Sequence, residues 1–312
     1  MQSEVCILAY SSLTGYVFLE NTFQILNNMR SELYKRNLSQ LYLTLVPILT
    51  VVFGLGVGYI SYQIYLPVWL LNVVLMIVAA WVLGAHIIKT GDQEKKHIAA
   101  CALFFIVPTM LSSMFAGLGA PPYENPKVWV SSATEQLTRY YFLLAMGVLI
   151  AFGYAILREK LKKTSGNYYS LLGFIAIQIA IPMYLIDMSF WGFYLTKLYR
   201  IMAASPIGKT PEWVLPLRNQ FFYINMMVAA LVYLATAAFA MSLKKAGWFK
   251  PVSCNIYILI SLVFFLLDVL PPTLPEPFAT FNFIVSIPAI PFMLPYFIGI
   301  NLLRKVGTDP SE

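Results

Sequence analysis

The stretch from Phe221 to Leu243 reads FFYINMMVAALVYLATAAFAMSL and contains no Asp, Glu, Lys or Arg. A helix needs about 20 mostly apolar residues to cross the hydrocarbon core of a bilayer, and this stretch meets that length. Basic residues bound it on both sides, with Arg218 before it and Lys244 after it. The stretch therefore predicts a membrane-spanning helix.

The composition of the whole chain extends this prediction. Of its 312 residues, 59% are apolar and 11% are Asp, Glu, Lys or Arg, whereas soluble domains carry roughly 25% charged residues. The mean hydropathy is +0.72, and 22 Phe, 20 Tyr and 6 Trp are more aromatic side chains than a soluble fold of this size buries. This composition excludes a cytosolic globular protein and indicates an apolar surface that faces lipid.

Similar apolar windows, bounded by charge or by Pro and Gly, recur along the chain. They predict an all-α, polytopic membrane helix bundle with eight transmembrane helices. Two helix starts carry local signals: Pro67 suits a first turn, and Ser132 followed by Glu135 is a capping-box pattern. The predicted spans are Leu41–Tyr62, Pro67–Ile88, Ile98–Leu118, Tyr140–Leu157, Tyr168–Phe190, Phe221–Leu243, Cys254–Leu270 and Phe278–Leu303.

The distribution of Lys and Arg predicts the orientation, because cytoplasmic loops accumulate these residues. The eight-span prediction assigns fifteen of the 21 to one side and six to the other. Both termini are therefore predicted to be cytoplasmic. The cytoplasmic group is Arg30, Lys35, Arg36, Lys89, Lys95, Lys96, Arg158, Lys160, Lys162, Lys163, Lys244, Lys245, Lys250, Arg304 and Lys305; the outer group is Lys127, Arg139, Lys197, Arg200, Lys209 and Arg218.

The formal net charge of +7 follows from this distribution. A basic cytoplasmic rim beside anionic lipid headgroups accounts for it, so we expect the lipid bilayer as a partner and no nucleic acid. The internal cytoplasmic connections, Lys89–His97, Arg158–Asn167 and Lys244–Ser253, are too short to hold a nucleotide-binding domain. Short basic loops and cytoplasmic thiols favour a bacterial inner membrane over an organelle.

The chain divides into three segments. Residues 1–40 are expected to form a cytoplasmic or interfacial amphipathic segment, because Val5–Leu19 is apolar but too short and too polar to span. Residues 41–303 form the transmembrane domain, and residues 304–312 form a short cytoplasmic tail. Met29, just before Arg30, is an alternative start that would leave residues 1–28 outside the native protein.

Proline marks the outer connections, and it stiffens them because it fixes φ. A rigid outer surface suits a binding face or the docking of protein subunits; alternatively, these prolines only end helices at the interface. The residues concerned are Pro121, Pro122, Glu124 and Pro126; Pro206, Pro211, Glu212, Trp213 and Pro216; and Pro271, Pro272, Pro275, Glu276 and Pro277.

Ionisable residues inside a membrane are candidates for function, because a charge there is costly without a partner or a purpose. Asp187, Asp268 and Arg139 all fall near the outer ends of predicted spans, and they predict one outward-facing pocket with Arg200 and Arg218 above it. The alternative is a set of independent interfacial charges. On that interpretation Arg139 pairs with the residue four positions before it, Glu135.

Uncharged polar side chains and prolines lie deeper in the spans. Candidate intramembrane polar residues are Gln178, Asn225 and Asn282, with Thr236, Ser261 and Ser286; bonds between helices are their usual role. Pro108 and Pro182 lie in the third and fifth spans, and Pro288, Pro291 and Pro295 in the eighth. Three prolines predict a kinked or locally unwound eighth span, whose freed carbonyls could bind a cation or mark a moving gate.

Redox and metal sites receive little support. His86 and His97 flank one predicted cytoplasmic hairpin, which makes a bis-imidazole haem or a metal site at His86 conceivable. His97 follows two lysines and is typical of a solvated loop, so we predict no haem, metal or other cofactor. Cys6, Cys101 and Cys254 show no CxxC spacing, and no P-loop, GxSxG or HExxH motif is present.

Three functions remain open. The broken eighth span and the outer acidic pair favour a protein that binds or translocates a small solute or ion from the outer face. The scarcity of charge in mid-membrane and the rigid outer loops fit a non-catalytic subunit or assembly factor of a larger membrane complex, including a respiratory one. An enzyme acting at the outer leaflet ranks third, because no spacing singles out catalytic residues.

Overall fold

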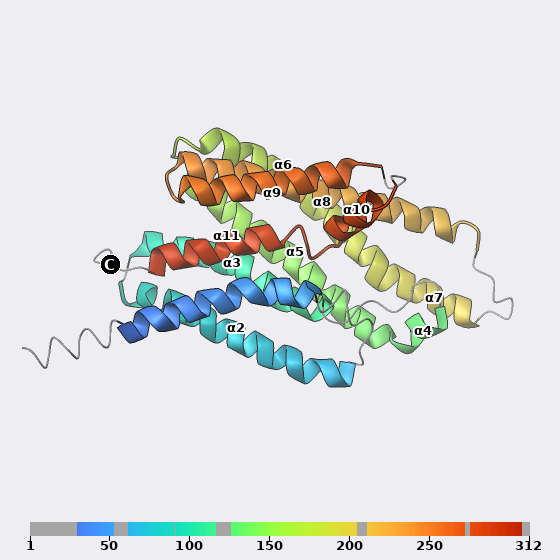
Figure 1. Cartoon of the computed structure of the whole chain (residues 1–312). Helices are drawn as coiled ribbons and strands as arrows, with labels where there is room; N and C mark the ends of the chain where they lie inside the picture. The colour runs from blue at the N-terminus through green and yellow to red at the C-terminus, as the bar shows by residue number, and fades with distance from the viewer. Residues whose placement is uncertain are drawn as a thin grey trace, which may run out of the picture.

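The computed structural model describes residues 30–52, 62–90, 92–116, 126–204, 211–271 and 275–307. Within these ranges all regular structure is helical, and the helices form an elongated bundle (Figure 1). They are residues 30–52, α2 (Tyr62–Thr90), α3 (Gln93–Ala116), α4 (Pro126–Ser131), α5 (Ala133–Leu161), α6 (Asn167–Ser189), the π-helix η1 (Phe190–Tyr194), α7 (Leu195–Ala204), α8 (Val214–Lys245), α9 (Pro251–Val269), α10 (Phe278–Ser286) and α11 (Met293–Gly307).

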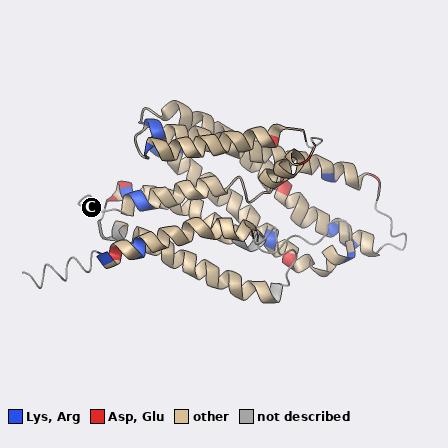
Figure 2. Ribbon diagram, viewed as in Figure 1, with Lys and Arg blue, Asp and Glu red and all other residues tan. Residues whose placement is uncertain are grey.

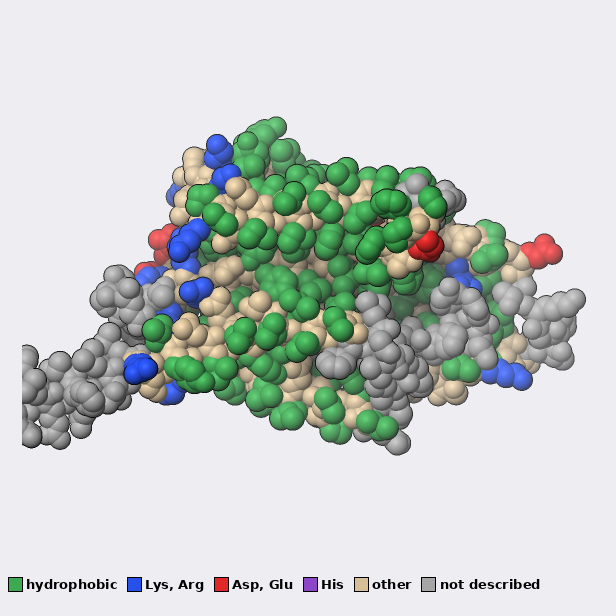
Figure 3. Space-filling model, viewed as in Figure 1, with side chains coloured by type: hydrophobic (Ala, Val, Ile, Leu, Met, Phe, Trp, Pro, Cys, Tyr) green, Lys and Arg blue, Asp and Glu red, His purple; other side chains and the backbone are tan. Residues whose placement is uncertain are grey.

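Six helical stretches among the described residues are long and apolar enough to cross a membrane. Lys and Arg gather near the ends of the helices (Figure 2), and hydrophobic side chains cover most of the lateral face seen in Figure 3. The lateral surface is therefore suited to contact with lipid. The stretches are Ile64–Gly84, Gln93–Ser112, Ala133–Leu161, Asn167–Ala204, Val214–Lys245 and Pro251–Val269.

Helix α8 is the central helix of one half of the bundle, with α6 and α9 packed along it. Of its apolar window 72% is buried inside the protein, against 17% for α9. Small residues allow the close approach of α6, since a Cβ atom added to Gly173 would lie 2.9 Å from the carbonyl oxygen of Ala235. Packing through small residues is a common means of association between membrane helices.

The other half of the bundle is built on α3, which packs against α5, α11 and α2. An aromatic cluster joins the two halves. The ring of Tyr154 on α5 lies 5.0 Å, centroid to centroid, from both Phe105 on α3 and Phe239 on α8. The Tyr154 hydroxyl is 3.1 Å from Thr236 Oγ1, also on α8, so this one side chain connects three helices.

The structure changes the predicted spans in two ways. Several helices extend beyond the apolar windows; α5 begins at Ala133 instead of Tyr140, and its added turns hold the ion pair of Glu135 with the buried Arg139. Pro67 lies inside α2 and not in its first turn. The first predicted span, Leu41–Tyr62, overlaps residues 53–61, which lie outside the described residues, as do residues 1–29 and several of the outer-loop prolines.

The eighth predicted span, Phe278–Leu303, is two helices in the structure. The first predicted span runs into residues outside the described ranges, so the other six predicted spans correspond to the six long apolar stretches found among the described residues. Helix α10 has 9 residues and α11 has 15, and residues 287–292 form turns between them. Pro288 and Pro291 explain the interruption, because proline has no backbone N–H and its ring clashes with a preceding helical turn. The predicted break is therefore present.

Helix α6 does not end at the predicted Phe190. It continues through η1 into α7, giving a helical stretch of 38 residues from Asn167 to Ala204. Gly192 allows α5 to pack against η1, because a Cβ atom at this position would overlap Tyr140 Cβ. Single-turn π segments often occur at functional sites, and this one adjoins the cavity described next.

Candidate functional site

A cavity of about 270 Å³ lies among α4, α5, α6, η1, α8 and the end of α10. It lies toward the end of the bundle that carries α4 and α7 (Figure 1). Aromatic rings supply much of its wall, while polar groups enter from three elements. The aromatic residues are Trp129, Tyr140, Trp191, Phe222 and Phe283; the polar ones are Asp187, Arg218, Asn219, Asn225 and Ser286.

Asp187 stands at the last turn of α6, where the helix widens into η1. Its Oδ1 accepts a hydrogen bond of 3.0 Å from Nε1 of Trp191, which is four residues along the chain. Its Oδ2 is buried and has no hydrogen-bond partner among the described residues. Burying a carboxylate oxygen without a hydrogen-bond partner costs free energy. A proton, a bound cation or a hydrogen-bond donor on a ligand would offset this cost.

The broken end of α10 forms the opposite wall. Helix α10 ends at Ser286, and α8 supplies donors for two of its terminal carbonyls. Asn225 Nδ2 donates to the Ser286 oxygen at 2.6 Å, and Tyr233 Oη donates to the Val285 oxygen at 2.8 Å. Because buried carbonyl groups at a helix terminus need hydrogen-bond donors, these two side chains stabilise the interrupted end of α10.

Asp268 joins the same network from α9. Ser286 Oγ donates to Asp268 Oδ1 and also lies 2.7 Å from the Asn282 carbonyl oxygen. Asp268 Oδ2 is buried without a hydrogen-bond partner in the described part of the chain. Since Ser286 lines the cavity, Asp268 lies directly behind its wall. Two carboxyl groups, on α6 and α9, therefore flank or back the cavity.

The predicted pocket residues separate into groups. Asp187, Arg218 and Asn225 line the cavity, and Asp268 contacts it through Ser286. The remaining predicted residues lie elsewhere: Arg139 is buried in an ion pair with Glu135, Arg200 is exposed on α7, Gln178 is exposed on α6, and Asn282 binds backbone carbonyls of α9.

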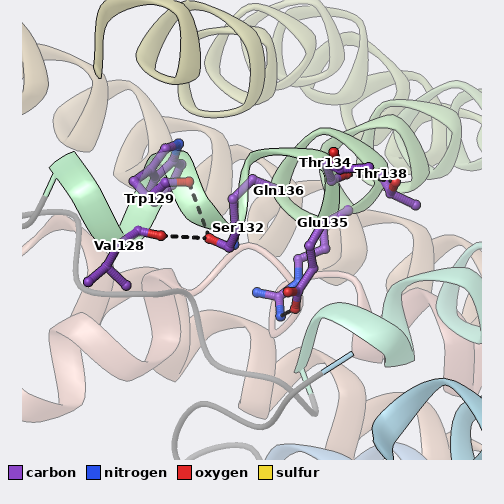
Figure 4. Close-up of polar contacts among 8 residues, drawn as sticks. Val128, Trp129, Ser132, Thr134, Glu135, Gln136 and Thr138 are labelled. Carbon is purple, nitrogen blue, oxygen red and sulfur yellow. Dashed lines mark hydrogen bonds and ion pairs between the residues drawn. The ribbon is translucent and has the colours of Figure 1, made fainter. Parts of the chain in front are cut away.

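Trp129 is a wall residue that sequence reasoning missed. It lies on the short helix α4, and its Nε1 donates to Thr196 Oγ1 at 2.9 Å. The expected capping box beside it is absent: Ser132 Oγ donates back to the carbonyls of Val128 and Trp129 at 3.1 and 3.2 Å (Figure 4). Ser132 thus stabilises the turn between α4 and α5 by donating to carbonyl groups of α4 and not accepting from the amides of α5.

Phe222 and Asn219 were also missed, although a signal for Phe222 exists in the sequence. Arg218, Phe222 and Asn225 are spaced by four and three residues, which places them on one face of a helix. Tyr140 carried no comparable signal, because its place in the wall depends on how α5 packs against η1.

Of the two histidines considered for haem or metal binding, the structure describes the side chain of His97 alone. His97 is exposed near the start of α3, and the side chain of His86 lies outside the described residues. In the described ranges no group of three or more His, Cys, Asp or Glu side chains could hold a metal ion. Cys101 and Cys254 are free and buried.

Comparisons with models of protein families, with curated proteins and with solved structures found no match to this chain.

Proposed function

We propose that the chain crosses a bacterial inner membrane eight times with both termini in the cytoplasm. The six long apolar stretches account for six crossings. The first predicted span, Leu41–Tyr62, of which residues 41–52 are helical among the described residues, and the pair α10–α11 would supply the other two, since the described helices of both run along the bundle (Figure 1). The fifteen-to-six division of Lys and Arg supports the orientation.

Cysteine labelling in intact cells tests this topology. The three native cysteines are replaced by alanine, and one cysteine is introduced in place of either exposed Glu212 or exposed Lys163. A membrane-impermeant maleimide added outside should label Glu212→Cys at once, and Lys163→Cys only after the membrane is opened. The reverse pattern would invert the orientation, and labelling of both from outside would refute the span count between them.

We further propose that the protein binds a small polar solute or ion in the cavity and translocates it. The observation that carries this proposal is the convergence of Asp187, Arg218 and Asn225 on one cavity beside the broken end of α10. Asp187 can accept hydrogen bonds from a cation or an ammonium group. Arg218 and the Asn225 amide can hold an anionic or carbonyl group, and a few convergent polar groups within apolar walls are typical of ligand sites.

The broken helix favours translocation over binding alone. Discontinuous helices near the middle of the membrane are a recurrent feature of transporter binding sites, because their ends can move and can present backbone groups to a ligand. In this chain Asn225 and Tyr233 already pair two carbonyls at the break, so the support comes from its position. In this chain the break adjoins the cavity directly, through Ser286, Ile287 and Pro288. The π segment on the facing wall gives a second irregular element at the same place.

Neutralising Asp187 tests the proposed site. The purified chain is screened by thermal shift against Na⁺, K⁺, small amines and amino acids, and uptake of any stabilising compound is measured in liposomes. Asp187→Asn should weaken the binding of that compound at least about tenfold, the scale of one charge-assisted hydrogen bond, and should abolish uptake. The variant should remain folded, because the amide is neutral and the native Oδ2 makes no hydrogen bond to the described residues.

Glu212→Gln is the matched control, since Glu212 is an exposed acid in the turn just before α8 and does not line the cavity. It should bind and transport as the native chain does. Unchanged binding and flux in Asp187→Asn would refute the site, and equal losses in both variants would assign the effect to general surface charge.

A further inference from the structure

A second cavity, of about 430 Å³, lies at the opposite end of the bundle, between the α8–α9 turn and the end of α11. Its lining includes Lys250, Ser253, Asn301, Arg304, Lys305 and the ring of Trp248. It shares no residue with the first cavity. An inference from it is therefore independent of the proposed transport function.

The charge of this cavity is positive. Three of its lining residues are cations, and none of its lining residues in the described part of the chain is an acid. Lys305 Nζ lies 5.2 Å from the centroid of the Trp248 ring, a cation–π distance that positions the ammonium group. Helix α9 begins at Pro251, and the positive end of its backbone dipole adds to the field at Ser253.

The surroundings of the cavity indicate the source of the anion. Trp248 and Phe249 lie in the connection between the end of α8 and the start of α9. Aromatic rings at the ends of long apolar helices are enriched at the level of lipid headgroups. Val252 and Ile256 on α9 are 70% and 51% exposed, and they offer apolar surface to acyl chains next to the cations. A free anion such as inorganic phosphate has no apolar part that could contact this surface, whereas a lipid has acyl chains.

We propose that this cavity binds the phosphate of an anionic membrane lipid headgroup, with Lys250, Arg304 and Lys305 as its cationic contacts. Ser253 and Asn301 can donate further hydrogen bonds to phosphate oxygens. Basic pockets between membrane helices on the cytoplasmic side are suited to such headgroups. The bound lipid would tie the C-terminal end of α11 to the α8–α9 turn.

Lipid titration of the purified full chain tests this assignment. The thermal midpoint in detergent is followed while phosphatidylglycerol, phosphatidylcholine or inorganic phosphate is added, and bound lipid is counted by native mass spectrometry. Phosphatidylglycerol should raise the midpoint and remain bound, whereas phosphatidylcholine should do neither. The variant Lys250→Gln, Arg304→Gln, Lys305→Gln should need at least about tenfold more phosphatidylglycerol for the same shift.

The matched control removes three cations from the same end of the bundle but outside the cavity: Lys160→Gln, Lys162→Gln, Lys163→Gln. This control should keep the native lipid response. Three outcomes would each overturn the proposal. The two triple variants could lose the lipid response equally, or phosphatidylcholine could raise the midpoint as much as phosphatidylglycerol does. Inorganic phosphate alone could also give the full rise in midpoint, with no further rise when lipid is added. The altered side chains all lie at the protein surface or at the edge of the cavity. The thermal midpoints of both variants without lipid should therefore stay close to that of the native chain.

Discussion

Replacing Tyr154 by alanine is expected to lower the free energy of unfolding by about 3–5 kcal/mol, the range for large aromatic side chains removed from a packed core. Tyr154 is 1% exposed and contacts α3 and α8 at once, through Phe105, Phe239 and Thr236. Lipid tails are as apolar as the protein interior, so the loss comes mainly from packing contacts and should fall at the lower end of this range, which includes transfer out of water. The change can be measured by reversible unfolding in mixed micelles with rising fractions of dodecyl sulfate.

Phe152→Ala on the same helix is the matched control, because Phe152 is 52% exposed on the lateral surface. Its removal should cost well under half as much. Tyr154→Phe keeps the ring and loses only the hydroxyl bond to Thr236, so it should cost about 1 kcal/mol. Equal losses from Phe152→Ala and Tyr154→Ala would show that the aromatic cluster does not join the two halves of the bundle.

The long helices were predictable because hydropathy is a sum over one contiguous segment. Phe221–Leu243 identifies α8 from its own residues, without reference to neighbours. Summed hydropathy alone predicts one continuous helix for the eighth span, because Phe278–Leu303 is apolar throughout. The structure has two helices there. Proline supplied the missing local signal: Pro288 and Pro291 lie in the interruption between Ser286 and Met293, whereas Pro295 lies inside α11.

The site was harder to predict, because its geometry depends on contacts between helices. Asp187 and Arg139 both fall at the same end of predicted spans, but only Asp187 lines the cavity. The direction in which Arg139 points is set by its partner, Glu135, four residues earlier. This four-residue spacing can be seen in the sequence. For Arg139 the alternative interpretation, a pair with Glu135 and no part in the pocket, is therefore the correct one. The spacing of Asp187 and Trp191 is likewise four residues, but nothing local in the sequence shows that this pair faces a cavity, because that depends on how α4, α5 and α8 pack around it.

The second large effect is expected at Asn282 on α10. Its Nδ2 donates to the carbonyl oxygens of Leu267 at 2.9 Å and Leu270 at 3.1 Å, which end helix α9. Asn282 is 2% exposed, so water cannot replace it. Asn282→Leu keeps the branched shape and the number of heavy atoms of the side chain but leaves these acceptors without a donor, and it should cost about 2–3 kcal/mol.

Asn255→Leu is the control for this substitution. Asn255 is an exposed residue of α9 whose Oδ1 accepts a hydrogen bond of 2.8 Å from Lys244, and its loss should change stability by less than about 0.5 kcal/mol. Mixed-micelle unfolding compares the two variants directly. Unfolding of Asn282→Leu at the native detergent fraction would refute the role of Asn282 in terminating α9.

The same pair of variants also separates the fold from the site. Asn282 holds α10 against the end of α9, and this contact positions Ser286 beside Asp268 and the cavity. Asn282→Leu should therefore weaken binding of the stabilising compound along with stability, while Asn255→Leu leaves both unchanged. Because Asp187 lies on α6, across the cavity from this contact, Asp187→Asn should weaken binding with little change in stability. A loss of binding in both Asp187→Asn and Asn282→Leu, with a loss of stability only in the latter, would show that the helix break serves the cavity and is not merely tolerated by the fold.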